Sequence, residues 1–90
     1  MIAMMNTFQR ETKEFVPIDV YRGDVISTEG VLFAVTGPNE RPVVFEPAEI
    51  LEGETGILIN NLVPGTYRVW AKVIDILEVP VIDCGLFRVV

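Results

Sequence analysis

The chain has 90 residues, of which half are apolar, and it carries a formal net charge of −6 at neutral pH. This length predicts one domain, close to the lower limit for a self-sufficient hydrophobic core. The apolar content predicts either a very full core or an apolar surface meant for a partner. Because only 7 basic residues stand against 13 acidic ones, the composition argues against nucleic acid or an anionic membrane as the ligand.

Residue types that are missing from the chain exclude several kinds of chemistry. There is no histidine, so Ser-His-Asp and Cys-His catalytic arrangements are impossible and the commonest zinc ligand is lacking. The single cysteine, Cys84, allows no intrachain disulfide. It has no cationic neighbour in sequence, so we interpret it as an ordinary strand residue and not as a reactive thiol. We therefore expect a protein that is not an enzyme and that uses no cofactor or metal.

The chain begins with a segment of uncertain class. Residues 1–14 are interpreted as an N-terminal arm or a first edge strand, and residues 15–90 as a single domain. The apolar residues 1–5 are too few for a signal peptide or a membrane span, and three methionines among them leave the true start open. Phe8 is the only aromatic residue of the arm.

The first well-defined strand pattern follows the arm. Within residues 15–21, alternation predicts that Val16, Ile18 and Val20 are buried. Pro17 cannot donate a ladder hydrogen bond, so it indicates an edge strand or a bulge. Arg-Gly-Asp at residues 22–24 predicts a tight turn.

The middle of the chain contains short apolar runs separated by loop residues. Residues 30–36 are nearly continuously apolar, which is typical of a strand that is buried on both faces or meets a partner with its outer face. Residues 37–42 predict a loop, and residues 43–45 a short strand. Residues 48–54 predict either one helical turn or a connection between sheets. A further strand over residues 56–60 places Ile57 and Ile59 on one face.

The strand predicted over residues 66–74 shows the clearest alternation. Tyr67, Val69, Ala71 and Val73 alternate with Arg68, Trp70 and Lys72, and the first set is predicted to be buried. The last strand, over residues 81–90, contains Gly85 as a predicted bulge. About seven short strands at roughly 8–12-residue spacing, with no convincing helix, predict an all-β sandwich.

The turn before residue 66 resembles the tyrosine corner of immunoglobulin-like and fibronectin type III domains. The resemblance rests on Leu62, Pro64, Gly65 and Tyr67. It implies that the tyrosine ring fills the edge of the core and that its hydroxyl binds the backbone a few residues upstream. It also implies an immunoglobulin-like or fibronectin type III-like β-sandwich, with residues 66–74 as strand F and residues 84–90 as strand G. The Cys–Trp–Cys core of antibody domains is absent from the sequence.

Three segments resemble a family of small β-sandwich virion proteins from tailed bacteriophages of actinobacterial hosts, related to long-tail-fibre-C-type domains. They are residues 7–15, 64–71 and 80–87. The resemblance covers nearly the whole chain and includes no active-site motif. It implies a structural protein of the virion, in capsid decoration, the head–tail connection or the tail. The implied partners are other virion proteins and copies of the chain itself.

The outward set of the strand over residues 66–74 is the candidate contact surface. If Phe87 and Val89 face inward, the outward Leu86 and Arg88 lie beside that set. An exposed tryptophan is often a contact residue, whereas in the competing interpretation the N-terminal arm or a loop covers it. The candidate contact residues are Trp70, Arg68, Lys72, Leu86, Arg88 and Phe8.

Two other kinds of site remain as alternatives. A carbohydrate- or cell-surface-binding module would use Trp70 and Tyr21 as stacking platforms. Two groups of carboxylates are interpreted as solvated charge, since neither has the spacing of a calcium loop and nothing places a pair across a cleft as glycoside hydrolysis requires. These groups are Glu49, Glu52 and Glu54, and Asp75, Glu78 and Asp83.

Overall fold

The computed structural model describes residues 6–11, 13–22, 25–27, 29–74 and 79–90. Within these residues the chain forms strands and no helix, and therefore no helix that could span a membrane. The strands are β1 (Asn6–Phe8), β2 (Glu14–Pro17), β3 (Val20–Arg22), β4 (Val25–Ser27), β5 (Val31–Thr36), β6 (Glu46–Pro47), β7 (Glu49–Leu51), β8 (Glu54–Ile59), β9 (Gly65–Val73) and β10 (Val81–Val89).

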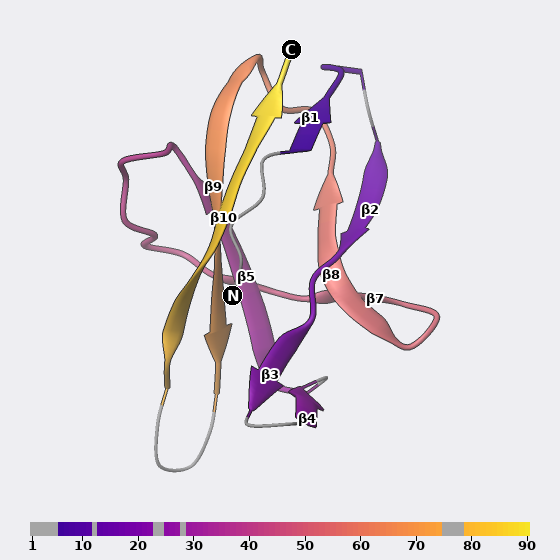
Figure 1. Cartoon of the computed structure of the whole chain (residues 1–90), viewed down its shortest axis with the longest axis vertical. Coiled ribbons are helices and arrows are strands. Elements are labelled where there is room, and N and C mark those ends of the chain that lie inside the picture. The colour runs from indigo at the N-terminus through magenta and orange to yellow at the C-terminus, as the bar shows by residue number, and fades with distance from the viewer. Residues whose placement is uncertain (1–5, 12, 23–24, 28, 75–78) are drawn as a thin grey trace.

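Two main sheets are formed by these strands. The large sheet has the order β1-β10-β9-β5-β6, and the small sheet has the order β2-β8-β7. A separate hairpin joins β3 and β4. The pairing of β1 with β10 is parallel, and the other described pairs are antiparallel. Figure 1 shows β5, β9 and β10 on one side of the molecule and β2, β7 and β8 on the other. The predicted all-β class is confirmed, and the two sheets are compatible with a β-sandwich.

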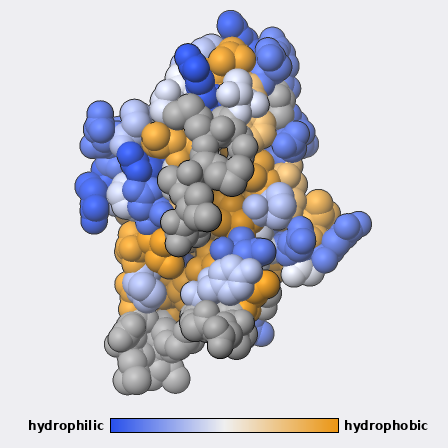
Figure 2. Space-filling model, in the orientation of Figure 1, coloured by the Kyte–Doolittle hydropathy of each residue, from blue (hydrophilic) through white to orange (hydrophobic). Residues whose placement is uncertain are grey.

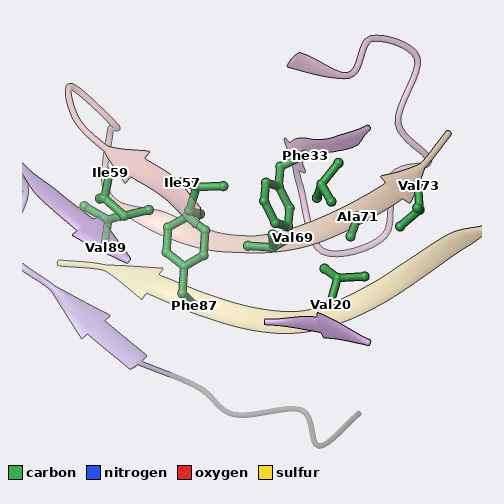
Figure 3. Packing of buried hydrophobic residues seen from close by; sticks show 10 residues of the cluster. Val20, Phe33, Ile57, Ile59, Val69, Ala71, Val73, Phe87 and Val89 are labelled. Carbon is green, nitrogen blue, oxygen red and sulfur yellow. The ribbon is translucent and has the colours of Figure 1, made fainter. Parts of the chain in front are cut away.

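The hydrophobic core lies between the two sheets. Figure 3 shows side chains of β5, β9 and β10 meeting those of β8, with Val20 of β3 closing one end. The alternation predicted for β9 places Val69, Ala71 and Val73 in this core, as expected. Phe87 and Val89 of β10 also face inward. Each fully buried Val, Ile or Phe side chain contributes roughly 1.5–3 kcal/mol relative to its exposed state, so packing alone holds this disulfide-free domain together.

Two predicted strand edges are present in the structure. β1 lies at the edge of the large sheet, where the ring of Phe8 meets Phe87 edge-on at 5.8 Å between ring centroids. Pro17 ends β2, which is an edge strand of the small sheet, as its missing N–H donor requires. Residues 1–5 and most of the turn predicted at residues 22–24 lie outside the described residues.

The chain changes sheets between β6 and β7. β6 pairs with β5 in the large sheet, whereas β7 pairs with β8 in the small sheet, so Ala48 is the crossing point. The sequence predicts a helical turn or a connection between sheets for residues 48–54, and only Ala48 makes such a connection, because residues 49–51 form β7. The β7–β8 hairpin then closes through Glu52 (φ 51°) and Gly53 (φ 81°). Two consecutive positive φ angles give the type I′ turn that matches the twist of paired strands.

The strand predicted over residues 43–45 is wrong. This segment runs between the loop after β5 and β6 without pairing to another described strand. Its apolar residues made it resemble a strand, but Phe45 instead lies under the ammonium group of Lys72, at 5.2 Å from the ring centroid. A strand requires a neighbouring strand whose backbone groups pair with its own N–H and C=O groups, and an apolar sequence pattern does not show whether one is present.

The bulge predicted at Gly85 is present. The register of β10 against β9 shifts between Asp83 and Gly85, and Gly85 has a φ of 100°. Its N–H donates to Oδ1 of Asp83 at 2.9 Å, which satisfies a backbone group that the bulge removes from the ladder.

Candidate protein-contact site

The turn that leads into β9 makes the hydrogen bond that the tyrosine-corner resemblance implies. The hydroxyl of Tyr67 donates to the carbonyl oxygen of Val63 at 2.6 Å. Its ring stacks on Phe87, with 5.3 Å between centroids and an interplanar angle of 18°. Leu62 is half-buried against the core, whereas Pro64 and Gly65 are exposed at the turn. These residues fix the entry of β9 and therefore have a structural role.

Trp70 is not exposed, and its prediction as a surface contact residue is wrong. The side chain points away from the core, as its phase predicts, but only 7% of it is accessible. Its indole Nε1–H donates to Oγ1 of Thr36 at 3.0 Å. The guanidinium carbon of Arg41 lies 5.0 Å from the ring centroid, at a distance that permits a cation–π interaction. Trp70 is therefore covered by residues 37–45, which we call the covering loop. This agrees with the competing interpretation, in which a loop covers the tryptophan.

Arg68 and Lys72 fix the same covering loop. Nε of Arg68 donates to the carbonyl oxygen of Pro38 at 2.9 Å, and its guanidinium forms an ion pair with Asp83. Lys72 lies over the ring of Phe45. The outward side chains of β9 therefore bind a loop of their own chain, in the place where the sequence predicted a partner.

The remaining contact candidates lie along β10 and its edge. Leu86 pairs with Arg68 and Arg88 pairs with Thr66, so both are on the predicted outer face. Arg88 is exposed, whereas Leu86 is half-buried. Phe8 is half-buried and packs on the core cluster through β1. The structure thus brings Leu86 and Arg88 close to Arg68, but it does not form the single apolar patch around Trp70 that the pattern predicted.

The other sequence-predicted groups are dispersed. Tyr21 is exposed on β3, but the buried Trp70 offers no stacking face to a sugar. Glu49, Glu52 and Glu54 lie along the β7–β8 hairpin, and Asp83 is engaged by Arg68. Among the described residues, no group of three acidic or thiol side chains could hold a metal ion. Asp75 and Glu78 lie outside the described residues.

Cys84 lies half-buried beside the bulge of β10. Burial raises the pKa of its thiol to about 11, and the negative charge of Asp83 adds to the rise. A thiol with this pKa stays protonated at neutral pH, and the protonated form is a poor nucleophile. The local environment thus suits a packed strand residue.

Sequence reasoning missed an apolar surface on the side of the molecule. Val43 is 93% exposed and Val44 is 68% exposed, while Val35 of β5 and Leu58 of β8 are 39% and 44% exposed. Val35, Val44 and Leu58 line one open groove of about 700 Å³, which we call the lateral groove. The signal that could have found it is the Val-Val pair next to Pro42, because aliphatic side chains in a segment without strand neighbours have little to cover them.

Apolar side chains also lie on the face of the molecule shown in Figure 2. Hydrophobic residues gather over its middle and lower left, while hydrophilic residues occupy its upper end and the projections on either side. The left projection corresponds to the covering loop and the right one to the β7–β8 hairpin in Figure 1. On this face (Figure 2), apolar surface is thus gathered mainly along the body of the domain.

Comparison with known proteins gave no match, since no protein-family model, curated protein or solved structure is similar to this chain at a significant level.

Proposed function

We propose that this chain is a non-enzymatic structural protein of a tailed-bacteriophage virion and that it acts through protein–protein contacts. The observation that carries the proposal is the exposed aliphatic surface at the lateral groove. Val35, Val44 and Leu58 expose apolar area there, and Val43 is the exposed chain neighbour of Val44, in a chain of net charge −6. Contiguous apolar patches on a small soluble domain mark interaction sites, because each buried aliphatic group stabilises the complex.

An immunoglobulin-like architecture for the domain is supported by the order of its strands. In immunoglobulin domains one sheet contains strands B, E and D in that order, and the other contains C, F and G. Here β2, β8 and β7 follow the first order, and β5, β9 and β10 follow the second. The hydrogen bond from Tyr67 at the start of β9 stands where the tyrosine corner opens strand F.

The virion assignment is supported by the resemblance of residues 7–15, 64–71 and 80–87 to small phage virion proteins. The site of contact differs from the one that the sequence suggested. The outer face of β9 is occupied by the covering loop, whereas the lateral groove is open. We therefore assign the contacts to the lateral groove and not to the surface around Trp70.

The test uses purified phage particles that contain either the natural chain or a variant. Replacing Val44, which lines the lateral groove, and its exposed neighbour Val43 by Ser removes aliphatic groups at the groove without touching the core. The matched control is Val79→Ser, because Val79 is also an exposed valine but does not line the groove. We expect the natural chain and the control in the particle, and the double variant reduced by about tenfold or more, as a loss of 1.4 kcal/mol implies.

Quantitative mass spectrometry of the particles measures the incorporation. Finding the natural chain in the lysate but not in the particle would refute the virion role. A monomeric chain that binds a glycan array through Tyr21 would favour the carbohydrate-binding alternative instead. Equal incorporation of the double variant and the control would show that the lateral groove is not the contact site.

A further inference from the structure

Both sheets leave part of a strand edge unpaired around the lateral groove. β6 pairs only with Leu32 and Phe33 of β5, and β7 pairs only with residues 54–56 of β8. Among the described strands, residues 34–36 of β5 and 57–59 of β8 therefore have no neighbour on this side. Because β5 and β8 belong to facing sheets, their open edges border the same groove.

The direction of the backbone groups follows from two hydrogen bonds. The carbonyl of Thr55 accepts from the N–H of Ile18, so Thr55 faces β2. Backbone groups alternate along an antiparallel strand, so Leu58, three residues further, faces the open edge with both its N–H and its C=O. The carbonyl of Val31 accepts from Ala48 on the β6 side, and by the same alternation Val35 faces its open edge.

The core is also incomplete at this end. Val35 lies on the inner face of β5, opposite the buried Val69, yet 39% of it is accessible. Phe33 and Ile57 line the floor of the groove beside it. An inward-facing aliphatic side chain that remains partly exposed gains further burial when a partner supplies an apolar neighbour.

The charge around the groove specifies the chemistry of that neighbour. Glu46 and Glu49 are the only charged residues among the described residues that line it. Glu49 pairs with Gly56, and Gly56 and Leu58 are on the same outward face of β8. A strand that extended β7 along β8 would therefore direct alternate side chains inward, toward Val35, and outward, to the face on which Glu49 lies.

We propose that the lateral groove receives an extended segment of a partner protein, in which aliphatic residues alternate with Lys or Arg, as a strand added to β8. The main chain of the segment bonds the N–H and C=O of Leu58. Its aliphatic side chains cover Val35 and Ile57, and the basic side chains of its other face lie near Glu49. Main-chain bonds give such strand addition its affinity, and the alternate side chains give it specificity. This inference rests on the proposed function and names the chemistry of the partner.

The experiment uses the whole chain and a blocked nine-residue peptide that alternates Val and Lys. Amide hydrogen exchange measured by NMR reports the bonds to the main chain of Leu58. We expect exchange at the Leu58 amide to slow by at least about tenfold at saturation, because a new ladder bond protects it. A peptide that alternates Val and Glu should bind about tenfold more weakly, since the carboxylate of Glu49 then repels its charged face.

Two further arms test the geometry and the charge. N-methylation of the Val-Lys peptide at the amides that face β8 should abolish binding, because it removes main-chain donors and leaves the protein unchanged. Glu49→Lys should reverse the preference between the two peptides. Unchanged exchange at Leu58, or unaltered binding of the N-methylated peptide, would overturn strand addition. Protection of Leu58 in a dimer without peptide would also overturn it, because a second copy would then occupy the groove.

The particle experiment separates this inference from the proposed function. A chain that is incorporated into particles but does not bind the Val-Lys peptide would overturn strand addition and leave the virion role standing. A chain that binds the peptide but is absent from particles would overturn the virion role and support strand addition.

Discussion

Removing the indole of Trp70 should lower the free energy of unfolding of the domain, because the side chain is buried and does not form an exposed contact surface. The side chain is 7% accessible, donates a hydrogen bond to Thr36 at 3.0 Å and lies under Arg41. Large-to-small substitution of a buried aromatic residue costs about 3–5 kcal/mol. Since a small domain is stable by about 5–15 kcal/mol in total, Trp70→Ala should lower the free energy of unfolding by about a fifth or more.

A graded series divides this loss into its parts. Trp70→Phe keeps an aromatic ring under the covering loop but removes the Nε1–H donor, so we expect a loss of about 1 kcal/mol plus the smaller ring's packing. Arg41→Ala removes the cation from the ring and should cost about 0.5–1 kcal/mol. Val81→Ala changes an exposed residue of β10 and is the control, for which the free energy of unfolding should hardly change.

Urea unfolding followed by far-UV circular dichroism measures all four variants. Tryptophan fluorescence is unsuitable for the Trp70 variants, because Trp70 is the only tryptophan in the chain. A loss below about 0.5 kcal/mol for Trp70→Ala, within the range of ordinary surface substitutions, would refute the burial argument. It would return Trp70 to the role of an exposed contact residue.

Two more predictions concern the tyrosine corner and the free thiol. Tyr67→Phe removes the hydrogen bond to Val63 and keeps the stacking on Phe87. Chemical denaturation should show a loss of about 1 kcal/mol in the free energy of unfolding, with an unchanged circular dichroism spectrum. No loss would contradict a structural role for the hydroxyl. Burial raises the pKa of Cys84 from 9.0 to about 11, so the folded chain favours the protonated thiol. The stabilising effect of the protonated thiol is present below pH 9 and is lost as pH rises toward 11. The natural chain should therefore lose stability relative to Cys84→Ala over this interval. Alkylation of Cys84 by iodoacetamide should correspondingly be slow at pH 7 in the folded chain, and rapid labelling there would contradict the raised pKa.

The predictable part of the fold is the part that depends on local alternation. The inward set of β9 is visible in the sequence because successive strand residues point to opposite faces. The bulge at Gly85 follows from a glycine within an apolar run, and the hydrogen bond from Tyr67 follows from a recurrent turn. Each of these features is decided within about ten residues, so no knowledge of the rest of the chain is needed.

The candidate site was not predictable in the same way. Whether the outward Trp70 is exposed depends on residues some 30 positions earlier in the chain, where Thr36 of β5 accepts its hydrogen bond and Arg41 of the covering loop lies over its ring. Period-two alternation identifies a face but not what lies over that face. The strand predicted over residues 43–45 is wrong for a related reason, because apolar content predicts burial or pairing only if another segment comes close.

The covering loop contributes both to the burial of Trp70 and to the lateral groove. Arg41 lies over Trp70, and Val44 of the same loop lines the lateral groove. We expect a ligand that displaces Val44 to disturb the environment of the indole ring as well, so the only tryptophan of the chain can serve as an intrinsic optical probe. Emission wavelength and acrylamide quenching of Trp70 would then follow occupancy of the groove in the unmodified protein, without any label on the protein or its partner.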